Sequence, residues 1–125
     1  MRRKQTSLML AASLASLLSI GSVHFAAAAD GAKKDMTGEE LAFDKSKGNC
    51  LACHAMPNVP GAEAPGNIAP PLVDMKARFP DKAKLRERIW DEMKFNPNTS
   101  MPPFGLHKIL TEQEIDKVTD FIYGI

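Results

Sequence analysis

The sequence contains few residues of three types that stabilise small proteins, namely cysteine, tryptophan and tyrosine. Its 125 residues include only two cysteines, one tryptophan and one tyrosine. Basic and acidic residues are nearly balanced, at 16 against 15, so no strong positive field favours nucleic acid as a partner. The length allows one compact domain and excludes a large multi-domain enzyme.

The sequence also lacks an apolar run of the length that a membrane span needs. Residues 8–23 contain only apolar residues, Ser and Gly, which is 16 residues against the roughly 20 of a spanning helix. Three basic residues precede this run, and four alanines at 26–29 follow it. A positive start, a short apolar segment and small residues at a cleavage site are typical of a secretory signal.

We therefore expect residues 1–29 to be a signal peptide rather than an uncleaved anchor, with cleavage after Ala28 or Ala29. No cysteine lies near this site, which argues against a lipid anchor. The mature domain is expected to cover residues 30–125, to be located in the periplasm, and to have no membrane attachment after cleavage.

Large aliphatic side chains are scarce in this mature segment. Leu, Ile, Val and Phe together number 20 within residues 30–125, close to the level below which chains stay disordered. A domain that is so small and so poor in core residues needs a disulfide, a metal, a cofactor or a partner to stabilise it.

Three segments have helical patterns, and no segment has the alternation of a strand. We expect residues 39–47 to form a short helix that Gly48 and Asn49 terminate. Residues 81–94 carry an apolar stripe, and residues 111–123 begin with a capping box and continue with an apolar face. The stripe consists of Leu85, Ile89 and Met93, and the face of Ile115, Val118 and Ile122.

Prolines separate these helical segments. Residues 56–71 and 97–103 contain too many prolines for a helix or a central strand, so both are expected to be long loops. The sequence therefore predicts a small all-α domain with two proline-rich loops.

The sequence Cys50-Leu51-Ala52-Cys53-His54 is the strongest chemical signal in the chain. A C-x-x-C-H motif is typical of the covalent attachment of a c-type haem. Two thiols on one turn can add to the two vinyl groups at one edge of a porphyrin. The histidine that follows is then in place to ligate the iron. We expect one covalent haem c.

Other uses of this motif fit the sequence less well. A zinc site needs four ligands, and the chain offers only the two cysteines, His54 and one distant histidine. A thioredoxin-like motif requires a βαβ pattern, which is absent from the sequence. A plain disulfide between Cys50 and Cys53 would leave the small core without a stabilising group.

The residues offer several candidates for the second axial ligand. Met101 lies 47 residues after His54 in a loop that three prolines stiffen, which suits a weakly binding thioether. Met56 is too close to His54 in sequence to reach the opposite haem face, and Met75 and Met93 resemble core residues. His107 is the remaining alternative, although a histidine exposed to solvent is its simpler interpretation.

The ligating histidine also needs an acceptor for its second ring nitrogen. The Pro70 carbonyl, in Ile68-Ala69-Pro70-Pro71-Leu72, can supply one if the loop passes the haem edge. Ligation by one histidine and one methionine favours electron transfer over oxygen chemistry.

At these residues the sequence resembles class I cytochromes c, and more narrowly the SoxX family of small haem subunits. The resemblance extends from about Gly38 to Ile125. The blocks that carry it most clearly are residues 47–57, 66–72 and 96–105. It implies the class I cytochrome c fold, with few helices around one covalent haem. It also implies that Cys50 and Cys53 hold the haem, that His54 and Met101 ligate the iron, and that the Pro70 carbonyl accepts from His54.

SoxX proteins form a heterodimer with SoxA, whose haem has a modified cysteine ligand. The resemblance therefore implies a SoxA-type partner, a SoxYZ-type carrier to which thiosulfate is oxidatively joined, and a soluble cytochrome c that takes the electrons. No catalysis is expected from this chain alone. A free class I electron carrier is the competing hypothesis, and a peroxidase is a third, which ligation by Met101 would exclude.

Overall fold

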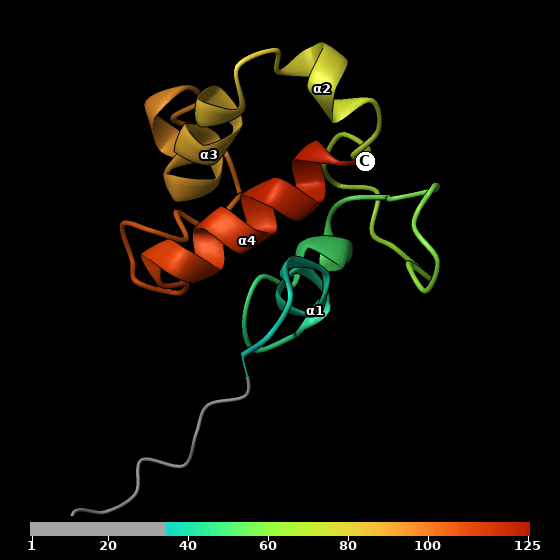
Figure 1. The fold of residues 1–125 in the computed structure, drawn as a ribbon. Coiled ribbons are helices and arrows are strands. Elements are labelled where there is room, and N and C mark those ends of the chain that lie inside the picture. The colour runs from blue at the N-terminus through green and yellow to red at the C-terminus, as the bar shows by residue number, and fades with distance from the viewer. Residues whose placement is uncertain (1–34) are drawn as a thin grey trace, which may run out of the picture. The chain divides into compact units, whose positions relative to one another are not determined.

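The computed structural model describes residues 35–125, which form short helices joined by long irregular segments (Figure 1). The helices are α1 (Gly38–Phe43), α2 (Met75–Arg78), α3 (Lys82–Trp90) and α4 (Glu112–Tyr123), with 3-10 turns η1 (Cys50–Ala52) and η2 (Glu92–Lys94). No strand occurs within residues 35–125, so the all-α prediction is confirmed there. The expected signal peptide and the domain boundary at residue 30 lie outside the described residues.

Helix α4 is the helix that the sequence predicts best. Thr111 caps its N-terminus by accepting a hydrogen bond from the backbone N–H of Glu114, whose carboxylate accepts one from Thr111 in return. The expected apolar face is buried, with Ile115, Val118 and Ile122 all at most 3% exposed.

Helix α1 is shorter than expected. It ends at Phe43 rather than Lys47, because the Asp44 backbone is extended and its carboxylate accepts from both the N–H and the hydroxyl of Ser46. These bonds lower the pKa of Asp44. Gly48 lies beyond the helix and folds back, donating its N–H to the Leu41 carbonyl at 2.9 Å. The prediction that Gly48 and Asn49 cap this helix is therefore wrong.

Helices α1 and α4 cross at close range. A Cβ atom on Gly38 would lie 2.1 Å from the Lys117 carbonyl oxygen and 2.8 Å from Cβ of Phe121. Phe43 meets the ring of Phe121 edge to face, with the centroids 6.1 Å apart. Glycine at position 38 is what allows the two backbones to approach this closely.

Helix α3 also ends earlier than the sequence predicts. The backbone is extended at Asp91, whose carboxylate accepts from the N–H of Met93 at 3.1 Å and begins the separate turn η2. Leu85 and Ile89 are buried as expected. Met93 is 37% exposed, because the break at Asp91 turns it away from the stripe.

The core packs against one face of α4 and collects side chains from separate segments spread over residues 41–122. Two of its members are methionines, Met56 and Met75, each 1% exposed, in keeping with the scarcity of large aliphatics. The buried cluster consists of Leu41, Met56, Leu72, Met75, Leu85, Ile89, Phe104, Leu110, Ile115, Val118 and Ile122. Helix α2, which the sequence did not predict, contributes Met75.

Candidate functional site

The C-x-x-C-H motif forms one tight turn. Asn49 enters it in the left-handed region, with φ at +47°, a conformation that asparagine tolerates better than most residues. The backbone N–H groups of Cys53 and His54 both donate to the Cys50 carbonyl, at 3.2 and 2.9 Å. Both cysteines are free, so no disulfide joins them. The turn therefore brings two thiols and an imidazole together on a short piece of backbone.

Two glycines allow other segments to pack against this turn. A Cβ atom on Gly48 would lie 2.6 Å from the Leu41 carbonyl oxygen and 3.3 Å from Sγ of Cys50. A Cβ atom on Gly66 would lie 1.9 Å from the Ala52 carbonyl oxygen. Both positions thus require glycine, and both lie in the sequence blocks, 47–57 and 66–72, that carry the family resemblance.

The first proline-rich loop runs alongside the turn and is bonded to it through the backbone. Residues 66–72 donate three hydrogen bonds to residues 51–55, with lengths of 2.8 to 3.1 Å. The donor and acceptor pairs are Gly66 to Leu51, Ala69 to Cys53, and Leu72 to Ala55. We call these three bonds the backbone ladder. They hold the loop at a fixed distance from the motif.

The ladder places the Pro70 carbonyl oxygen 2.6 Å from Nδ1 of His54, which is the contact that the sequence analysis anticipated. A carbonyl oxygen can only accept, so Nδ1 carries the proton of the neutral ring. The lone pair then lies on Nε2, which has no hydrogen-bond partner among the described residues. A histidine fixed in this tautomer is well prepared to ligate a metal through Nε2.

The Cys50 thiol is neutral at physiological pH. Burial raises its pKa to about 11, and the nearby Cys53 adds to the increase. A zinc site would use thiolates and a set of four ligands. Within residues 35–125 no group of three or more His, Cys, Asp or Glu side chains is arranged to hold a metal ion. The donor set therefore suits thioether attachment better than direct metal binding by the cysteines.

One side-chain and one backbone hydrogen bond between neighbouring residues hold the loop around Met101 in shape. The Thr99 hydroxyl accepts from the N–H of Met101 at 3.1 Å, and the Asn96 carbonyl accepts from the N–H of Thr99 at 3.0 Å. Met101 is half-buried and packs against the core. Its role as the second axial ligand stays a prediction.

The competing ligand candidates are placed differently. Met56 and Met75 are fully buried in the core, and His107 is exposed. Ile68, two residues before Pro70 in the same loop, is 74% exposed although it is apolar. The two free thiols, the oriented imidazole and this uncovered apolar side chain together fit a haem held by the motif.

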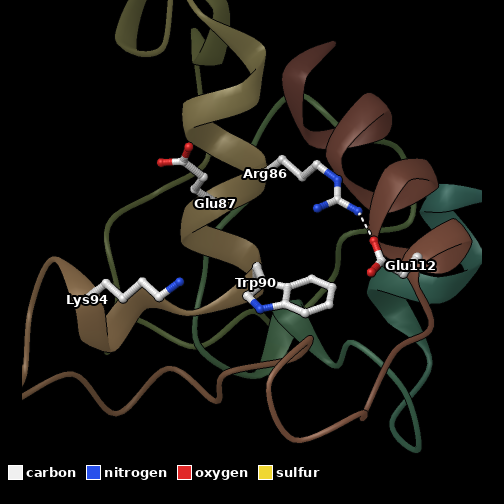
Figure 2. A pocket seen from close by; sticks show the side chains of 5 residues that line it. All are labelled: Arg86, Glu87, Trp90, Lys94 and Glu112. Carbon is white, nitrogen blue, oxygen red and sulfur yellow. Dashed lines mark hydrogen bonds and ion pairs between the residues drawn. The ribbon is translucent and has the colours of Figure 1, made fainter.

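A hollow elsewhere on the molecule does not involve these residues. It lies between α3 and α4 and is lined by Arg86, Glu87, Trp90, Lys94 and Glu112 (Figure 2). The Trp90 ring is held in place on one side by Gly105, where a Cβ atom would lie 2.1 Å from the indole. The Arg86 guanidinium lies 5.6 Å from the ring centroid. We interpret this hollow as a surface depression left where the two helices pack, and not as part of the candidate haem site.

Comparison with known proteins gives three findings. The family model described as cytochrome C oxidase, cbb3-type, subunit III matches residues 34–122. The crystal structure of SoxXA from P. pantotrophus is similar, with a TM-score of 0.62 and 29% identity, over 69% of this chain and 77% of that chain. An uncharacterized lipoprotein of Aquifex aeolicus (strain VF5) is 35% identical over 77 residues, 62% of this chain. The matched segment spans 36% of that lipoprotein's length.

Among residues 35–125, no helix is both long enough and apolar enough to cross a bilayer.

Proposed function

We propose that this chain is the electron-relay subunit of a SoxXA-like complex. The chain belongs to the family described as cytochrome C oxidase, cbb3-type, subunit III. Its fold is that of a SoxX-type c-type cytochrome. In this proposal the mature protein is periplasmic and pairs with a SoxA-type haem subunit. The complex couples thiosulfate oxidatively to a SoxYZ-type carrier, and the electrons pass through this chain to a soluble cytochrome c.

The observation that carries the proposal is the likeness to SoxXA, at 29% identity and a TM-score of 0.62. The family match by itself supports a c-type cytochrome with an electron-transfer role. The sequence blocks at residues 47–57, 66–72 and 96–105 support the narrower SoxX assignment, since they surround the motif, the Pro70 loop and Met101.

The residues of this chain have distinct tasks in that role. Cys50 and Cys53 would hold one haem through thioether bonds, and His54 would ligate the iron through Nε2. The Pro70 carbonyl keeps the His54 ring in the required tautomer. Haem iron supplies one-electron redox chemistry when it is bound. If Met101 also binds the iron, the two protein ligands would leave no room there for a substrate.

The chain has no further cysteine to take part in sulfur chemistry, since both cysteines lie in the motif. A modified cysteine ligand would therefore belong to the partner subunit. We accordingly assign substrate chemistry to the partner and electron relay to this chain. A free class I electron carrier is the second candidate, because the family match does not itself specify a complex.

The test is mass spectrometry of the protein purified from its own source. Under denaturing conditions we expect the chain plus the mass of one haem, and a Cys50→Ser/Cys53→Ser variant should lose that mass. A bare wild-type chain would contradict the cytochrome assignment. Under native conditions a stable complex with a larger haem protein supports the relay subunit, whereas a monomer favours the free carrier.

A further inference from the structure

A second hydrogen bond acts on the loop that holds His54. Nη1 of Arg78 donates to the Pro71 carbonyl oxygen at 2.7 Å, one residue after the carbonyl that accepts from His54. The same nitrogen lies 3.3 Å from Sδ of Met75, one turn earlier on α2. Two consecutive carbonyls of the proline pair are thus held by two different side chains.

The proline pair depends on such outside contacts. Pro70 and Pro71 have no backbone N–H, so neither can donate a backbone hydrogen bond to a neighbouring segment. The backbone ladder fixes the loop before and after the pair, through the N–H groups of Ala69 and Leu72. Between these two points, only carbonyl groups are available to set the orientation of the peptide units.

Arg78 reaches the loop from a well-anchored helix. Met75, at the start of α2, is 1% exposed, and its backbone N–H donates to the Ile125 carbonyl at 2.9 Å. The N–H groups of Ala77 and Arg78 both donate to the Asp74 carbonyl. The guanidinium therefore extends from a fixed base, and its planar donors suit a carbonyl in a defined direction.

We propose that Arg78 is a positioning residue for the haem ligand. By holding the Pro71 carbonyl it keeps the Pro70 carbonyl against Nδ1 of His54, and it thereby strengthens the bond that makes the imidazole a more basic ligand. This inference rests on the proposed function, because it concerns the electron-transfer properties of the haem-bound protein.

The sign of the change in reduction potential distinguishes this role from a purely electrostatic one. A weaker His54–Pro70 bond makes the imidazole less basic, which favours the reduced iron and raises the potential. Loss of one positive charge, by contrast, disfavours the reduced and more electron-rich state and lowers the potential. Lys76, on the same helix and also exposed, supplies the matched control for charge.

The experiment compares the haem-loaded wild type with Arg78→Ala, Arg78→Lys and Lys76→Ala. For Arg78→Ala we expect a higher reduction potential and an exchange of the His54 Nδ1 proton with solvent, followed by NMR, that is on the order of tenfold faster. Lys76→Ala should leave the exchange rate unchanged and should not raise the potential. Arg78→Lys, which keeps one donor and the charge, should fall between the wild type and Arg78→Ala.

The outcomes separate the two proposals. A wild-type chain without covalent haem contradicts the proposed function. A haem-loaded Arg78→Ala variant with unchanged proton exchange, or with a lowered potential like that of a simple charge loss, overturns only the role of Arg78. If Arg78→Ala does not fold, Arg78→Lys decides the question by the same two measurements.

Discussion

The site and the α3–α4 pair are held together by different kinds of contact. Around the motif, the backbone ladder and two glycines fix the chain, and the long side chain of Arg78 adds a bond to the Pro71 carbonyl. Between α3 and α4, long charged side chains make the visible links on the surface: Arg86 pairs with Glu112 and Asp116, and Lys82 pairs with Asp120. Backbone contacts tolerate no added atoms, whereas exposed ion pairs contribute little and are screened by salt.

The comparison is tested most strongly by Gly66→Ala. The new Cβ would lie 1.9 Å from the Ala52 carbonyl oxygen, a backbone atom that cannot move without disturbing the motif. We expect the variant to lower the free energy of unfolding by roughly 3 kcal/mol, in the range of severe overpacking. Chemical denaturation of the haem-loaded protein measures this.

Gly61→Ala is the matched control in the same loop. Gly61 has φ at +81° but nothing within 4 Å of an added Cβ, so only the backbone penalty of about 1 kcal/mol is expected. Equal losses in both variants would show that backbone conformation, rather than the close contact with Ala52, governs the loop.

The next largest effect is expected on the reduction potential, from a substitution at Met101. Met101→Ala should leave the haem covalently attached, because the cysteines lie on the turn that the ladder holds. The reduction potential should fall and the axial position should open, changes that redox titration and absorption spectroscopy record. An unchanged spectrum would mean that another residue ligates the iron, and His107→Ala is then the variant to examine.

A smaller effect is expected where the two regions meet. Glu114 takes part in the N-terminal cap of α4 and pairs with Lys47 at 2.7 Å. Lys47 lies between α1 and the C-x-x-C-H motif. Partial burial raises the pKa of Glu114, but the bonds from Lys47 and Thr111 outweigh it, so the net pKa lies below its ordinary 4.5. The stabilisation is therefore present above pH 4.5 and is lost as the pH falls below it.

Glu114→Gln should accordingly cost about 1 kcal/mol at pH 7 and progressively less as acid is added. The test is to measure the free energy of unfolding by denaturation from about pH 3 to about pH 7, a range that spans the ordinary carboxyl pKa. Lys47→Met isolates the ion pair from the helix cap. A loss for Glu114→Gln that stays constant throughout this range would contradict the assigned linkage.

The smallest effect belongs to the α3–α4 pair. Arg86→Ala removes two exposed ion pairs and the contact with Trp90, and should lower the stability by less than about 1 kcal/mol. The difference from the wild type should shrink in high salt. Lys82→Ala, whose pair with Asp120 is more exposed, should change less still. A loss comparable to that of Gly66→Ala would remove the contrast between the two regions.

Local signals in the sequence were enough to predict α4 and the central motif. The cap at Thr111 and the C-x-x-C-H spacing are contained in a few neighbouring residues. Helix α2 was missed because it has only four residues and begins after Asp74 in the left-handed region. It is held by the distant Ile125 carbonyl, which leaves no local pattern.

The site shows the same division. The contact of Pro70 with His54 was foreseen, because a ligating histidine needs an acceptor and the proline loop was a plausible source. Gly66 belongs to a block of the family resemblance, but neither its contact with Ala52 nor the bond of Arg78 to Pro71 can be predicted from sequence, since only the folded chain creates these close approaches. The length of α3 was overestimated because Asp91 bonds to Met93 and starts a new turn.

The backbone ladder also bears on the order in which the protein folds. Its three bonds join residues that are only 15 to 17 positions apart, whereas the crossing of α1 and α4 joins Gly38 to Lys117, 79 positions later. Contacts between near neighbours in sequence close fastest, because less chain entropy is lost in forming them. The turn that carries the thiols and the loop that orients His54 can therefore meet early, before α4 completes the core.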